Sequence, residues 1–189
     1  SSVSDTCHWP LHARYSHPPP LHAAFVPCAL QIIGSTRRLC DTAESWCDEQ
    51  DRDPETVLNA RIYEDMLPFT YQVKSVAVHT HGAVAALHEG RFSPDMAPPP
   101  DSFDGLRAAL DEAKAALEGT DESALEDFIG KEVRFEFGKL SLPFDAEEFL
   151  LSFSQPNYAF HAATAYDILR MLGIKIGKTD FLGRLRMRR

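Results

Sequence analysis

The chain has 189 residues, of which 44% are hydrophobic and 25% are charged, as is typical of a single soluble globular domain. The net charge of −9 argues against a general nucleic-acid binder, because phosphate contacts need a clustered basic surface. No apolar run of about eighteen residues predicts a membrane span and no apolar leader pattern is visible, so we expect a cytoplasmic protein. The four cysteines form no C-x-x-C pair, which favours a reduced setting.

Residues 1–20 end in three prolines and lack a periodic apolar pattern, so a disordered extension is expected there. The folded domain should cover residues 21–183, and the basic stretch "RLRMRR" at 184–189 reads as a solvated tail. Apolar residues recur at helical spacing from Leu21 to about Trp46, which predicts the first helix.

The second predicted helix begins at "DPE", with Asp53 as N-cap and Pro54 in the first turn. We expect it to run to Leu87 with a kink near Pro68. After a proline-rich loop, apolar residues at alternating spacings of three and four predict a third helix between Ser102 and Gly119. A short helical turn over residues 124–129 is expected next.

Residues 132–145 alternate apolar and polar on both sides of Gly138 and Lys139, which predicts a small hairpin. Asp145 and Glu148 resemble a capping box and open a last long helix that ends at Gly173. The predicted fold is therefore all-α: an antiparallel four-helix bundle with a small β-hairpin inserted before the last helix.

Polar residues occupy one face of the second predicted helix. Asp65, Gln72 and His79 lie at i, i+7 and i+14, and Arg61 lies one turn before Asp65, close enough to pair with it. The last helix carries a second polar face, made of Ser154, Asn157, His161 and Thr164. Two polar faces in one bundle predict that they meet in its interior.

A neutral imidazole can act as a base or bind a metal, and its second nitrogen needs an orienting partner. Asp65, Gln72 and Asn157 could supply that partner for His79 or His161. The alternative is a closed hydrogen-bond network that only fixes helix register. No cofactor is expected; if a divalent metal binds, His79, His161 and Asp65 are the predicted ligands.

Three separated stretches, "LNARIYEDMLPFTYQVKSVAVHTHGAVAAL", "FLLSFSQPNYAFHAATAYDILR" and "LGIKIGKTDFLG", resemble the domain-of-unknown-function 1993 family, a branch of the DinB-like and YfiT-like helical bundles. The resemblance implies a four-helix bundle over residues 21–183. In the wider superfamily three histidines commonly bind a divalent metal, and some members are thiol-dependent transferases or isomerases. His79 and His161 match two of the three histidines.

Two positions depart from the family pattern. Met171 stands where members often have a histidine, and Val78 stands where they often have an aspartate. These departures argue against the metal-dependent chemistry of the superfamily. The residues that the resemblance carries over as a candidate pocket are Asn59, Arg61, Asp65, Gln72, His79, Asn157, His161, Tyr166, Lys178 and Asp180. An alternative role for Asn59, Lys178 and Asp180 is to tie the C-terminal segment to the end of the bundle.

The leading hypothesis is a small-molecule enzyme that runs acid–base chemistry of the isomerase, dehydratase or cyclase type, by analogy in a biosynthetic pathway. His79 or His161 would be the base, Asp65 its orienter or the acid, and Tyr166 one of the groups that stabilise an oxyanion. A metal-dependent hydrolase or transferase is the second hypothesis, and a non-catalytic binding or dimerising bundle is the third. The expected partner is a small-molecule substrate, with no nucleic acid and no membrane, and a homodimer is compatible with the resemblance.

Overall fold

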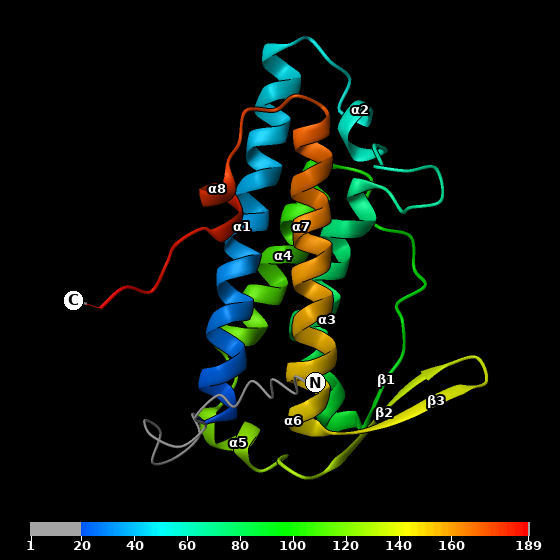
Figure 1. Ribbon diagram of the computed structural model, residues 1–189, viewed down its shortest axis with the longest axis vertical. Coiled ribbons are helices and arrows are strands. Elements are labelled where there is room, and N and C mark those ends of the chain that lie inside the picture. The colour runs from blue at the N-terminus through cyan, green and yellow to red at the C-terminus, as the bar shows by residue number, and fades with distance from the viewer. Residues whose placement is uncertain (1–19, 189) are drawn as a thin grey trace, which may run out of the picture.

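Within residues 20–188, which the computed structural model describes, four long helices lie side by side (Figure 1). They are α1 (Leu21–Glu49), α3 (Phe69–Glu89), α4 (Phe103–Glu118) and α7 (Gln155–Met171). The predicted helical bundle is therefore present. The expected disordered extension at residues 1–20 falls almost entirely outside the described residues.

Shorter elements join the four long helices. The helical ones are α2 (Glu55–Leu58), α5 (Glu122–Glu126), α6 (Ala146–Glu148), the π-helix η1 (Phe149–Ser154) and α8 (Lys178–Leu182). The strands are β1 (Arg91–Phe92), β2 (Glu132–Phe137) and β3 (Leu140–Asp145). β2 and β3 pair antiparallel where the sequence predicts a hairpin, with Phe135 opposite Leu142, and β1 adds to β2 in parallel.

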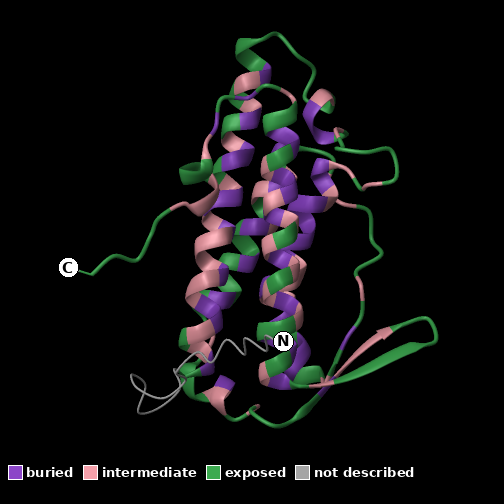
Figure 2. Cartoon of the chain, in the orientation of Figure 1, coloured by how far each residue is buried: buried purple, intermediate pink, exposed green. Residues whose placement is uncertain are grey.

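Local sequence explains where α4 begins and which face it buries. Ser102 is its N-cap, and the side-chain oxygen accepts a hydrogen bond from the Gly105 N–H at 3.1 Å. Asp104 in the first turn complements the positive end of the helix dipole. The buried residues follow the predicted spacing of three and four: Phe103, Leu106, Leu110, Ala113 and Leu117. The buried colour in Figure 2 likewise follows the inner faces of the long helices, whereas the hairpin is exposed over much of its length.

The second predicted helix is wrong over its first half. α2 ends at Leu58, and the chain then runs irregularly until α3 begins at Phe69. Pro68 disfavours helical geometry in the residue before it and has no N–H for a helical bond. The Phe69 N–H instead donates to the Ala60 carbonyl at 2.9 Å and closes a loop. Proline thus starts a new helix here and does not kink an existing one.

The prediction that neighbouring helices are all antiparallel is also wrong, because α3 and α4 run in the same direction. The Phe69 and Phe103 rings, at the first residues of the two helices, lie 6.4 Å apart. Near their last residues, His88 and Leu117 line one surface hollow. Figure 1 shows the reason: the chain after β1 runs back along the bundle before α4 starts.

α3 and α7 do run in opposite directions, and they pack against each other extensively. Gln72, early in α3, is hydrogen-bonded to His161. His79 lies two turns later in α3 and packs against Phe153, which precedes α7. This pairing brings the two predicted polar faces together. Among the described helices, none is long and apolar enough to cross a membrane.

Candidate functional site

A cavity of about 270 Å³ lies between α3, α7, the sheet and the segment that follows β1. Both histidines of the predicted polar faces line it. The other lining residues are Tyr71, Lys74, Ser75, Val78, Phe92, Pro94, Asp95, Phe135, Phe153 and Asn157. The volume lies just below the range usual for drug-sized ligands, so a small metabolite fits its scale.

The two imidazole rings lie next to each other in the cavity wall. The centroids of His79 and His161 are 5.6 Å apart and the ring planes differ by 15°, which is a stacked arrangement. The sequence predicts that these residues meet, and the structure brings them within reach of one small ligand. Phe153 closes the edge of the pair, with its ring 5.8 Å from His79.

Gln72 fixes the protonation of His161. Its side-chain N–H donates to the Leu67 carbonyl at 2.9 Å, which leaves the amide oxygen facing the ring. That oxygen lies 2.7 Å from His161 Nδ1, so Nδ1 carries the hydrogen and donates it. The remaining nitrogen, Nε2, therefore keeps its lone pair and can accept a proton.

His79 has no such orienting partner. Its Nδ1 is buried, and within residues 20–188 nothing hydrogen-bonds to it. An unpaired buried polar atom costs about 1–3 kcal/mol, which is a reason to look for a missing partner at this position.

Burial keeps both rings neutral. Loss of water lowers the pKa of His161 from its ordinary 6.5 to about 4. Burial first, and the neighbouring His161 second, lower the pKa of His79 to about 4 as well. At neutral pH the cavity therefore contains two uncharged imidazoles.

Lys74 supplies a charge that the sequence analysis missed. Its side chain is 9% exposed, and its ammonium lies 3.0 Å from the carboxylate of Asp95 in the segment after β1. It also donates to the carbonyls of Asp95, at 3.2 Å, and Ala97. The signal in the sequence was a single lysine inside the otherwise uncharged helix from Phe69 to Thr80.

Aromatic rings form the apolar side of the cavity. Phe92 of β1, Phe135 of β2 and Phe153 at the end of η1 pack together, with centroids 5.2 to 6.3 Å apart. The alternation in the hairpin predicted that Phe135 shares a face with its apolar neighbours. It could not predict that this face covers the histidines, because that depends on how the sheet sits on the bundle.

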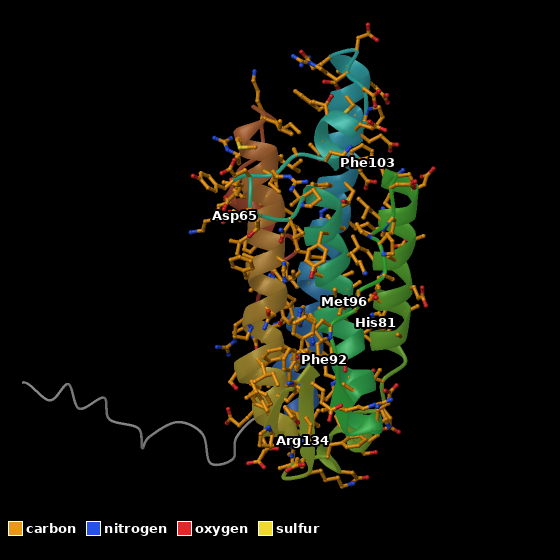
Figure 3. All side chains as sticks on the ribbon, turned by 90° about the vertical axis from the view of Figure 1, so that its right-hand side faces the viewer. Asp65, His81, Phe92, Met96, Phe103 and Arg134 are labelled. Carbon is orange, nitrogen blue, oxygen red and sulfur yellow. The ribbon has the colours of Figure 1, made fainter. Side chains whose placement is uncertain are left out.

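Several carried-over residues lie elsewhere. Asn59, Arg61 and Asp65 are exposed in the chain between α2 and α3, so Asp65 is not part of a helical stripe with Gln72 and His79. Figure 3 shows Asp65 nearer the Phe103 end of the bundle than Phe92.

The last carried-over residues lie at the C-terminal segment or on the cavity rim. Tyr166 packs against Phe181 of α8, with centroids 6.2 Å apart, and does not line the cavity. Lys178 and Asp180 belong to α8, where Asp180 accepts the Gly177 N–H at 2.7 Å. Asn157 does line the cavity, and its amide donates to the Phe153 carbonyl at 2.7 Å.

The residues present do not fit the three-ligand metal set of the wider superfamily. His79 and His161 supply two imidazoles, but Asp65 does not line their cavity. Over residues 20–188, no three His, Cys, Asp or Glu side chains gather closely enough to hold a metal ion.

Comparison with known proteins agrees with the fold. No curated protein matches the sequence. The crystal structure of a DinB family member from Shewanella denitrificans is similar, with a TM-score of 0.74 and 25% identity over 89% of this chain and 95% of that one. The family model described as "Domain of unknown function (DUF1993)" matches residues 21–182. That match covers most of the sequence, and the chain belongs to the DUF1993 family.

Proposed function

We propose that the protein is a small-molecule enzyme that moves protons in the cavity between α3 and α7. The observation that carries this proposal is the stacked pair of neutral imidazoles, one with its basic nitrogen left unbonded by Gln72 and one with a buried unpaired nitrogen. General acid–base catalysis needs such groups within hydrogen-bond reach of the substrate. The reaction class is an isomerisation, dehydration or cyclisation.

The two imidazoles take different roles. His161 accepts a proton through Nε2, and the Gln72 oxygen stabilises the ring through Nδ1 as positive charge develops on it. His79 returns a proton or holds a substrate oxygen. Neither Asp65 nor Tyr166 lines the cavity, so this proposal assigns them no part in the reaction. Gln72 replaces Asp65 as the orienting group.

A purely structural polar network is the rival interpretation. The chain from His161 through Gln72 to the Leu67 carbonyl is satisfied and would fix the contact between α3 and α7 on its own. His79 distinguishes the two interpretations, because a structural network has no use for a buried unpaired nitrogen.

The test is exchange of carbon-bound hydrogen for deuterium. A panel of small ketones and aldehydes is incubated with the protein in D₂O, and NMR follows deuterium at the carbon next to the carbonyl. Wild type should exceed buffer on at least one compound, and His79→Gln and His161→Gln should each lower that rate by about 100-fold or more. Tyr166→Phe is the matched control, because Tyr166 lies on α7 with His161 but outside the cavity, and its exchange rate should equal that of wild type. Exchange that survives both histidine substitutions would refute the proposal.

A further inference from the structure

Lys74 is a buried cation in the wall of the cavity. Its backbone belongs to the second turn of α3, and its side chain is 9% exposed. A buried ammonium is tolerated only when it is paired and hydrogen-bonded. Within residues 20–188 its partners are the Asp95 carboxylate and the carbonyls of Asp95 and Ala97, and all of them come from the segment after β1.

The two members of this ion pair differ in freedom. Lys74 is fixed on a packed helix, whereas Asp95 is 44% exposed and belongs to a segment without regular structure. The carboxylate can turn to water, but the ammonium cannot follow it. A ligand anion can therefore take the place of Asp95, whereas a ligand cation that captured Asp95 would leave Lys74 unpaired.

The apolar wall sets the shape of the rest of the ligand. Phe92, Phe135 and Phe153 present their rings to the same cavity that Lys74 lines. Aromatic rings pack well against flat apolar groups in offset or edge-to-face geometry. A volume of about 270 Å³ excludes large ligands.

We propose that the cavity takes a small organic monoanion, a carboxylate on a flat apolar body, whose oxygens replace the Asp95 carboxylate on the Lys74 ammonium. This inference rests on the proposed function, because it names the substrate class of the same site. One buried cation beside two neutral imidazoles balances one negative charge, so a phosphate dianion is a poorer match. Asp95 thus occupies the Lys74 ammonium until the substrate arrives.

The binding experiment compares two probes of the same shape, benzoate and the neutral benzamide, by calorimetry or NMR titration. Benzoate should bind wild type at least about tenfold more tightly than benzamide does. Lys74→Met should abolish that preference, because it removes the cation and keeps the side-chain volume. Asp95→Asn should tighten benzoate binding several-fold, because an amide competes less well for the ammonium. Asp101→Asn, an exposed change in the same segment, is the matched control and should change neither affinity.

Equal affinity for both probes, or weaker benzoate binding in Asp95→Asn, would overturn the inference. Circular dichroism shows whether Lys74→Met is folded; if it is not, Asp95→Asn decides alone. The failure of each proposal has its own signature. Histidine-dependent deuterium exchange without a benzoate preference would refute the anion-binding site and leave the proposed enzyme activity supported. A benzoate preference without any such exchange would refute the proposed enzyme activity and leave the anion-binding site supported.

Discussion

At the scale of single residues, the site depends on which nitrogen of each imidazole carries hydrogen. Gln72 settles this for His161 through its own bond to the Leu67 carbonyl. The sequence identified His79, His161, Gln72 and Asn157 from their spacing, and all four lie at or beside one cavity. It misplaced Asp65 because a helix was extended through Pro68, where the structure begins a new one.

Both histidines make stability depend on pH. Their pKa falls from 6.5 in the unfolded chain to about 4 in the fold, so the unfolded state binds protons more readily. The free energy of unfolding is therefore highest above pH 6.5 and decreases as the pH falls toward 4. Between pH 7 and pH 5, each imidazole should lower the free energy of unfolding by about 2 kcal/mol. In His161→Gln, urea unfolding at the two pH values should show a loss smaller by about that amount. Tyr166→Phe, which removes no histidine, should lose as much as wild type; an equal loss in His161→Gln would contradict the prediction.

Gln72 should control the basicity of His161. Gln72→Leu leaves the His161 Nδ1–H without its acceptor and should lower the free energy of unfolding by about 1–3 kcal/mol. Gln72→Glu places a carboxylate at the ring, and opposite charge should raise the pKa of His161 above its wild-type value. NMR titration of the ring protons measures this directly. A His161 titration that is identical in wild type and Gln72→Glu would show that the hydrogen bond does not form in solution.

At the scale of elements, capping and periodicity predict most boundaries. α4 begins after Ser102, as its N-cap indicates. The two hairpin strands cover residues 132–137 and 140–145, which are the two halves of the alternating stretch. The π-helix η1 was not predicted, because residues 149–154 carry no proline, glycine or charge that would mark it. η1 leads directly into α7, so it helps to set where Phe153 and Asn157 enter the cavity.

α8 is held to the bundle by a close approach at Gly183. Its φ is +66°, which favours glycine, and an added Cβ would lie 3.0 Å from the Ser35 Cβ and 2.7 Å from the Arg38 guanidinium of α1. Gly183→Ala should therefore lower the free energy of unfolding by about 1–3 kcal/mol. Gly34→Ala is the contrasting variant: the position is inside α1 and the nearest atom is 3.9 Å away, so stability should rise by about 0.5–1 kcal/mol. Chemical denaturation of the two variants should give opposite signs, and the same sign in both would contradict this docking of α8.

At the scale of the whole molecule, the direction of α4 was beyond the sequence analysis. A loop can turn the chain around or carry it back along the bundle, and helical periodicity is the same in both cases. The information lies in the length and composition of Ser93–Ser102. The segment contains four prolines, which favour an extended backbone. Figure 3 shows Met96 between the levels of Phe92 and Phe103, as expected if residues 93–102 run back along the bundle. This segment is called the strap below.

The length of that strap should therefore be critical. α3 has 21 residues and spans about 31 Å at 1.5 Å per residue. The ten residues from 93 to 102 reach about 33–36 Å when fully extended, so the connection has little slack. Deleting Pro98–Pro100 removes about 10 Å of reach and should abolish cooperative unfolding, because Phe103 could no longer lie beside Phe69. Inserting Gly-Ser-Gly between Pro98 and Pro99 lengthens the same strap and should cost only about 1 kcal/mol, since loop entropy grows slowly with length. Thermal and urea unfolding of the two variants decide the point. A deletion variant as stable as the insertion variant would mean that α4 runs opposite to α3. The segment that contains Asp95 would then not run along the cavity, and Asp95 would not line it.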